Sequence, residues 1–268
     1  MNLCSGVIFN ISMLTFLFSM MAVFGILVSI KGMPERMPRS RSRNHPVIGV
    51  FLIEYWIWLI VAPIEKVAMM LRMSATAVTF VALLFGIASG VTIGMGYFTA
   101  GGWLYLASAT LDILDGRIAK RTNTVSRVGG FLDSVLDRYG EMATLIGLGY
   151  YFFSASNGLG ITLAAMTALG AVMVSYTKSR AEALGAKSGG GFMQRPERAF
   201  FVGITTAADC FVTCFIERGV AHPFHWAVIA VLTFVGVSAN LTAIQRIVIF
   251  VKEIRGIDRK EKAGKEKD

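Results

Sequence analysis

Four aspartates in one short segment have the spacing that most directly suggests chemistry. Asp112 and Asp115 are three residues apart, and Asp133 and Asp137 are four apart. Residues at either spacing share one face of a helix, so each pair would project from a single helix surface. Two neighbouring helices carrying these pairs would direct four carboxylates into one space.

Carboxylates at the ends of apolar runs are costly unless they have partners or a water-filled cavity. The nearby cations are too few in suitable positions to neutralise them: Arg117, Lys120, Arg127 and Arg138. Oxygen ligands without His or Cys favour Mg²⁺ or Mn²⁺ over Zn²⁺. We therefore expect the four aspartates to hold two such ions about 4 Å apart, a site that promotes phosphoryl transfer. An ion-pair network or a proton path is the structural alternative.

Two glycines accompany the aspartates. Gly116 directly follows Asp115, and Gly129 lies four residues before Asp133. A missing side chain lets a ligand approach the backbone closely, which favours a phosphate site here. Close packing of membrane helices is the alternative explanation for either glycine alone.

The elements that carry these residues are expected to be membrane helices. Of the 268 residues, 54% are hydrophobic and only 16% charged, and the mean hydropathy is +0.61. Soluble domains have about 25% charged residues, so the composition excludes a disordered chain, a collagen-like fibre and a small disulfide scaffold. The net charge of +9 comes from basic residues that flank apolar runs. This pattern favours a positive-inside membrane protein over a nucleic-acid-binding one.

Several apolar runs are long enough to cross a bilayer. They lie at 7–30, 75–98, 101–114, 130–153, 159–176, 199–216 and 224–251. A signal peptide is the alternative for the first run, but no basic segment precedes it. The run at 50–71 is interrupted by charged residues and Pro63, which favours an interfacial helix over a span.

We predict an all-α, polytopic membrane helical bundle. It has six core transmembrane helices, an interfacial helix and an extra N-terminal transmembrane helix. The expected divisions are an N-terminal helix with a basic linker (1–46), an interfacial helix (47–72), a catalytic membrane domain (73–252) and a charged tail (253–268). Alternate loops are basic, which places the linker, the tail and the aspartates on the cytoplasmic side and the N-terminus outside.

The cysteines and histidines give no metal or disulfide pattern. All three cysteines lie in apolar segments without ligand spacing: Cys4, Cys210 and Cys214. The histidines are scattered: His45, His222 and His225. The His-x-x-His spacing at 222–225 lacks an accompanying carboxylate or cysteine cluster, so we expect a loop or interface role.

The acidic segment resembles the signature of CDP-alcohol phosphatidyltransferases. It reads Asp-x-x-Asp-Gly-x-x-Ala at 112–119, followed by Gly-x-x-x-Asp-x-x-x-Asp at 129–137. The resemblance covers about 75–251. Lys120 stands where the family usually has Arg, which keeps the charge but loses bidentate phosphate binding. Ala75-Thr76 stands where the family has Pro-Asn.

The resemblance implies a lipid donor, CDP-diacylglycerol, bound beside two metal ions. The donor-binding positions that it implies are Gly116, Ala119, Lys120, Ser126 and Gly129. An acceptor hydroxyl would attack the phosphorus attached to the diacylglycerol and release CMP, without a covalent enzyme intermediate. Asp137 would be both a metal ligand and the catalytic general base. A homodimer is expected, as in the family.

Three further cations concern the acceptor. Lys178 ends the fifth apolar run, Arg198 opens the sixth, and Arg246 lies within the last one. Together they could converge on a dianionic group, although flanking positive-inside charge is the simpler alternative. Their Ser-Tyr-x-Lys and Arg-Pro-Glu-Arg contexts resemble the phosphatidylinositol-phosphate synthase branch. That branch implies inositol 1-phosphate as acceptor. We expect Gly189, Gly190 and Gly191 to form a flexible loop between the two elements.

Other functions remain open from the sequence. The same chemistry could use glycerol 3-phosphate, unphosphorylated inositol or another sugar phosphate. A divalent-cation transporter could use the same carboxylates, and an inert homologue could serve as a lipid-binding scaffold. The expected location is a bacterial inner membrane, among membrane lipids, with the active site facing the cytoplasm and no nucleic-acid partner.

Overall fold

The structure is a computed structural model that describes residues 7–13, 15–16, 19, 56, 60–186, 191–217 and 223–265. Every regular element within these ranges is helical, which confirms the predicted all-α class. The rest of the expected N-terminal span, the basic linker and most of the interfacial run before 60 lie outside the described residues. The main helices are α3 (Ala62–Met70), α4 (Ala75–Gly94), α5 (Phe98–Arg121), α6 (Arg127–Ser154), α7 (Gly158–Ala183), α8 (Arg195–Phe215) and α9 (Trp226–Lys265).

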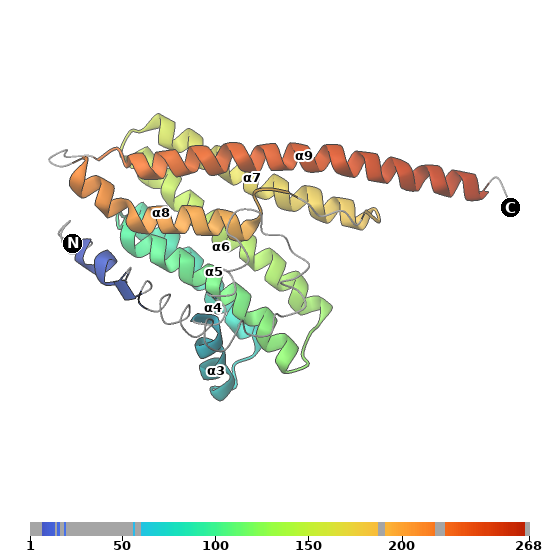
Figure 1. The fold of residues 1–268 in the computed structure, drawn as a ribbon, viewed down its shortest axis with the longest axis horizontal. Coiled ribbons are helices and arrows are strands. Elements are labelled where there is room, and N and C mark those ends of the chain that lie inside the picture. Colours follow the sequence, from blue (N-terminus) through green and yellow to red (C-terminus); the bar gives the residue numbers. More distant parts are fainter. Residues whose placement is uncertain are drawn as a thin grey trace.

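Four of the described helices are long and apolar enough to cross a membrane. They are α4, α7, α8 and α9 over 226–259. α5 and α6 contain the expected spans 101–114 and 130–153, and they also carry the acidic segment. α5 continues without a break through Asp112 and Asp115 to Arg121, beyond the expected end of its apolar run. Figure 1 shows that α9 extends well past the other helices toward the C-terminus.

The turn between α5 and α6 brings the two aspartate pairs to one end of the bundle. α6 begins at a Ser126 cap, whose hydroxyl accepts from the Gly129 N–H at 3.0 Å. Asn123 supplies a left-handed backbone conformation, with φ of 54°, in the tight reversal before it. Because consecutive helices reverse direction, this end also receives the start of α8 and the end of α7.

Small residues let α4 and α6 approach to backbone contact. A Cβ built on Gly90 would lie 2.1 Å from the carbonyl oxygen of Ala143, and one on Gly147 would lie 2.1 Å from that of Gly90. Such contacts are typical of membrane helix pairs, which lack a hydrophobic driving force between helices. Ser108 of α5 also donates to the Ala82 carbonyl of α4 at 2.8 Å. α6 is thereby held in register with α4, and through α4 with α5.

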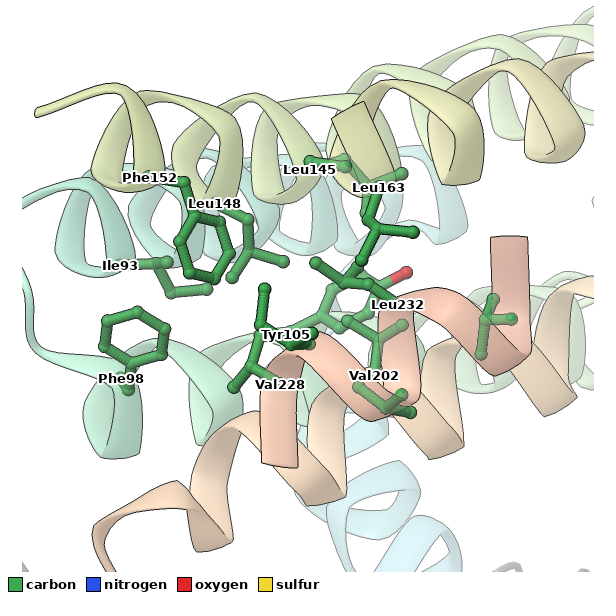
Figure 2. Close-up of a cluster of buried hydrophobic side chains, with 14 of the residues drawn as sticks. Ile93, Phe98, Tyr105, Leu145, Leu148, Phe152, Leu163, Val202, Val228 and Leu232 are labelled. Carbon is green, nitrogen blue, oxygen red and sulfur yellow. The ribbon is translucent and has the colours of Figure 1, made fainter. Parts of the chain in front are cut away.

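A buried apolar cluster joins the six long helices (Figure 2). Leu148, Phe152, Val228 and Leu232 are at most 1% exposed. Much of the outer surface is apolar as well, as expected for helices that face lipid. The labelled members of the cluster are Ile93, Phe98, Tyr105, Leu145, Leu148, Phe152, Leu163, Val202, Val228 and Leu232.

α3, the described part of the expected interfacial helix, is joined to α5 by buried charge. It runs steeply across the direction of the bundle helices (Figure 1). Glu65 is 1% exposed and forms ion pairs of 2.7 Å with both Arg117 and Arg121. Glu65, which interrupts the apolar pattern, therefore attaches α3 to α5. Pro63 lies in the first turn of α3, where its missing N–H leaves no helical hydrogen bond unmade.

The described N-terminal residues dock on α5 and α8. Asn10, in the helical stretch 7–13, is 1% exposed. Its amide donates to the Ala207 carbonyl at 2.6 Å and to the sulfur of Cys210, and its oxygen accepts from the Trp103 indole at 2.8 Å. A buried amide needs such partners, so this part of the extra helix packs as an element of the bundle. Cys210 and Cys214 are free thiols, and Cys4 lies outside the described residues.

Candidate active site

Three of the four predicted metal ligands gather where α5 ends and α6 begins. Carboxylate oxygens of Asp112, Asp133 and Asp137 lie within 4.8 Å of one another. The Oδ1 atom of Asp133 is buried, and it has no hydrogen-bond partner in the described part of the chain. A partly desolvated group of oxygen ligands with an unsatisfied acceptor fits a hard divalent cation such as Mg²⁺ or Mn²⁺.

Asp115 lies beside this group and is held by a residue that the sequence analysis did not identify. It is 4% exposed, and its Oδ2 atom accepts a hydrogen bond of 2.7 Å from Thr79 of α4. Groups that orient a metal-binding carboxylate usually affect the metal as strongly as the ligand itself. The only local signal for Thr79 is a polar residue one turn into an apolar helix, which is too common to indicate a role.

Arg195, in the first turn of α8, lies among the carboxylates. Its Nη1 atom is 2.7 Å from Oδ2 of Asp112 and also contacts Oδ2 of Asp137. In the sequence analysis, Arg195 was only the first residue of the Arg-Pro-Glu-Arg context of Arg198 and had no role of its own. Its spacing holds a signal, because Arg195 and Arg198 share a face of one helix, whereas Asp137 and its neighbour four residues later share a face of another.

That neighbour, Glu141, binds Arg198 in a buried bidentate ion pair. The Nε–Oε1 and Nη2–Oε2 distances are 2.8 and 2.9 Å, and both side chains are at most 3% exposed. The remaining terminal nitrogen, Nη1, lies 3.4 Å from the Met193 carbonyl. Arg198, predicted as an acceptor-phosphate ligand, is thus bound to Glu141 along one whole edge of its guanidinium.

The other two predicted acceptor ligands lie on α7 and α9. Arg246 is 4% exposed and donates to the Val174 carbonyl at 2.6 Å. A Cβ on Gly191 would lie 3.0 Å from its Nε atom, so the glycine leaves room for the guanidinium. Lys178, one turn after Val174, is partly exposed and lies 3.7 Å from Glu182. Segment 191–194 therefore lies between Arg198 and Arg246, while Gly189 and Gly190 are outside the described residues.

The predicted donor-binding residues lie in the last turns of α5 and at the start of α6. Gly116 is exposed, and a Cβ there would have nothing within 4 Å, so the surface beside Asp115 is open. Lys120 is also exposed, and Ala119 is partly buried. Ser126 and Gly129 form the cap of α6, which gives them a structural role in this structure.

His225 belongs to a polar cluster at the opposite end of the bundle. Its Nε2 atom is 2.7 Å from the Tyr151 hydroxyl, and its Nδ1 atom is 2.5 Å from Asp209. The ring also stacks on Phe98 at 4.0 Å. Both nitrogens are thus engaged within the bundle, and His222, the other member of the His-x-x-His spacing, lies outside the described residues.

Comparison with known proteins finds a family whose sequence model matches a region that includes the acidic segment. The sequence model for CDP-alcohol phosphatidyltransferases matches residues 66–238. The archaetidylinositol phosphate synthase of Methanothermobacter thermautotrophicus is 28% identical over 69% of this chain and 87% of that protein. The phosphatidylinositol phosphate synthase of Mycobacterium tuberculosis is 27% identical over 77% of this chain and 92% of that protein.

Two solved structures of the Mycobacterium tuberculosis phosphatidylinositol phosphate synthase share the fold. The one with CDP-DAG bound has a TM-score of 0.60 at 26% identity, covering 71% of this chain and 93% of that one. The one in complex with manganese and citrate has a TM-score of 0.61 at 26% identity, covering 71% and 88%. The region that the family model matches, residues 66–238, includes all four aspartates and excludes the N-terminal helical residues.

Proposed function

The chain belongs to the CDP-alcohol phosphatidyltransferase family, and we propose that it transfers the phosphatidyl group of CDP-diacylglycerol to inositol 1-phosphate. The products are phosphatidylinositol phosphate and CMP. It is an integral membrane transferase of phospholipid biosynthesis, which argues against the cation-transporter alternative. The observation that carries the proposal is the gathering of Asp112, Asp133 and Asp137 at the family's motif positions, in a chain similar to phosphatidylinositol phosphate synthases.

We propose that Asp112, Asp115, Asp133 and Asp137 hold two Mg²⁺ or Mn²⁺ ions. The support is the oxygen-only ligand set and the buried Oδ1 atom of Asp133, which has no hydrogen-bond partner among the described residues. When bound, the ions supply positive charge that neutralises a diphosphate and stabilises its leaving group. Thr79 would hold Asp115 in the orientation that this role requires.

An apolar cavity against the part of α5 that carries Asp112 and Asp115 supports a lipid donor. It has a volume of about 210 Å³ and lies between α3, α4 and α5. All the side chains that line it are apolar, and two of them, Leu111 and Leu114, immediately precede Asp112 and Asp115. An acyl chain in this cavity would leave the diphosphate of the donor beside the open surface at Gly116.

Asp137 is the proposed general base. It would take the proton of the acceptor hydroxyl as the new oxygen–phosphorus bond forms and the bond to CMP breaks. Lys178 and Arg246 would bind the acceptor phosphate from α7 and α9. Arg198 could add only its Nη1 edge, because Glu141 holds the other. The basic loops favour an orientation with this site toward the cytoplasm, in a bacterial inner membrane, and a homodimer is part of the proposal.

The test is CMP release from CDP-diacylglycerol by the purified protein in detergent. We expect release with inositol 1-phosphate and Mg²⁺ or Mn²⁺, little with inositol or glycerol 3-phosphate, and none with EDTA. Asp137→Asn should abolish turnover but retain donor binding, whereas the control Asp258→Asn, at an exposed site on α9, should be fully active. Faster CMP release with glycerol 3-phosphate than with inositol 1-phosphate would contradict the proposed acceptor. An active Asp137→Asn variant would contradict the assignment of Asp137 as general base.

A further inference from the structure

Arg195 is in direct contact with two of the residues proposed to bind metal. One guanidinium nitrogen lies 2.7 Å from Asp112 on α5 and also contacts Asp137 on α6. The side chain of Arg195 is 27% exposed, and those of Asp112 and Asp137 are 25% and 12% exposed. The contact is thus charged, shared between two helices and open to solvent on one side.

The neighbouring arginine on the same face of α8 makes a different kind of pair. Arg198 and Glu141 are fully buried and joined by two parallel hydrogen bonds. Breaking a buried pair of this kind is strongly unfavourable, because it leaves a buried charge without a partner. The Arg195 contacts can break at lower cost, because a partly exposed guanidinium returns to water when it leaves its carboxylates. α8 therefore presents one fixed and one exchangeable arginine to α6.

The contacts of Arg195 use the oxygens that a metal ion would need. Carboxylate oxygens of Asp112, Asp133 and Asp137 lie within 4.8 Å of one another, so their negative charges repel. In this structure Arg195 neutralises part of that charge through Oδ2 of Asp112 and Oδ2 of Asp137. Oδ1 of Asp133 remains without a hydrogen-bond partner in the described part of the chain. A divalent cation would satisfy that oxygen and would repel the guanidinium.

We propose that Arg195 is the internal counter-ion of the metal-free site and is displaced when a divalent cation binds. The inference rests on the proposed metal site of the four aspartates. Arg195 is a positioning residue in this role: it holds Asp112 and Asp137 together across α5 and α6 before the metal arrives. Its charge then opposes metal entry, so the intact site binds metal less tightly than its carboxylates alone would allow.

The test measures Mn²⁺ binding to the purified whole chain in detergent without substrate. Electron paramagnetic resonance reports the concentration of Mn²⁺ that stays free. Arg195→Gln should lower the dissociation constant about tenfold, equivalent to about 1.4 kcal/mol. Its thermal unfolding midpoint in EDTA should fall below that of the wild type, and saturating Mn²⁺ should remove most of this difference. The matched control is Arg180→Gln, which removes the same charge from an exposed site near the end of α7 and should change neither value.

Arg195→Lys keeps the experiment decisive if Arg195→Gln does not fold. An ammonium is a single point charge and bridges two carboxylates less well than a guanidinium. We expect its Mn²⁺ dissociation constant to lie between those of wild type and Arg195→Gln. Unchanged or weaker Mn²⁺ binding in the Arg195 variants would overturn the proposal. Absence of Mn²⁺ binding in the wild type would instead overturn the metal site itself, and the counter-ion role with it.

Discussion

Replacing Thr79 by valine tests how the fold prepares Asp115 for its role. The hydroxyl of Thr79 lies 2.7 Å from Oδ2 of Asp115, and both side chains are at most 5% exposed. Valine has nearly the shape of threonine, so the substitution removes the hydrogen bond and leaves the packing of α4 against α5 intact. The buried carboxylate then loses the hydrogen bond that Thr79 donates.

The expected size of the effect follows from the charge of the acceptor. A hydrogen bond to a charged group contributes about 1.5–3 kcal/mol, so the free energy of unfolding in EDTA should fall by about that amount. The hydroxyl also fixes the direction of a proposed metal ligand. Loss of such an orienting group weakens metal binding about 10- to 100-fold, and we expect the Mn²⁺ dissociation constant of Thr79→Val to rise within that range.

The assay combines thermal unfolding in EDTA with Mn²⁺ binding by electron paramagnetic resonance. Thr79→Ser keeps the hydroxyl and should stay within about threefold of wild type in Mn²⁺ affinity, since a change under about 0.65 kcal/mol leaves the bond essentially in place. The matched control is Thr206→Val on α8, because the Thr206 hydroxyl is buried and has no hydrogen-bond partner within the described ranges. It should be neutral or slightly stabilising. If Thr79→Val behaves like Thr206→Val in both measurements, Thr79 does not prepare Asp115 for metal.

Four further predictions concern the Arg198–Glu141 pair between α8 and α6, the contact of α4 with α6, the donor site and the metal. Arg198→Met should lower the free energy of unfolding by about 3–5 kcal/mol, and adding Glu141→Met should recover much of the loss, as thermal unfolding would show; equal losses in the single and double variants would contradict this. Gly90→Ala should lower the unfolding midpoint, because its Cβ would meet the Ala143 carbonyl. Gly116→Ala should unfold like wild type, because its Cβ would meet nothing within 4 Å, but it should raise the KM for CDP-diacylglycerol. A fully stable Gly90→Ala would show that α4 and α6 can separate, and an unchanged KM would place the donor elsewhere. Removing divalent cations with EDTA should stop CMP release, and adding Mg²⁺ or Mn²⁺ in excess should restore it; activity that persists in EDTA would contradict the metal requirement.

Much of the fold was predictable because its main signals are local. Runs of apolar residues predicted where α4 to α9 lie, and the all-helical class is confirmed. The apolar run did not show where α5 ends, because hydropathy reports burial in lipid whereas helix continuity depends on backbone hydrogen bonds. α5 stays helical to Arg121 although its apolar run ends near Leu114. Glu65 interrupts the apolar pattern of the interfacial element, and its charge is neutralised there by Arg117 and Arg121.

The sequence by itself determined which residue types are present and which of them share a helix face. Asp112 with Asp115, and Asp133 with Asp137, follow from spacing alone, because the period of a helix is a property of its own backbone. Only the tertiary structure decided which side chains meet across helices. The packing of α4 and of α8 against α5 brings Thr79 to Asp115 and Arg195 to Asp112. These partners come from α4 and α8, and their meeting depends on helix packing, which no local pattern encodes.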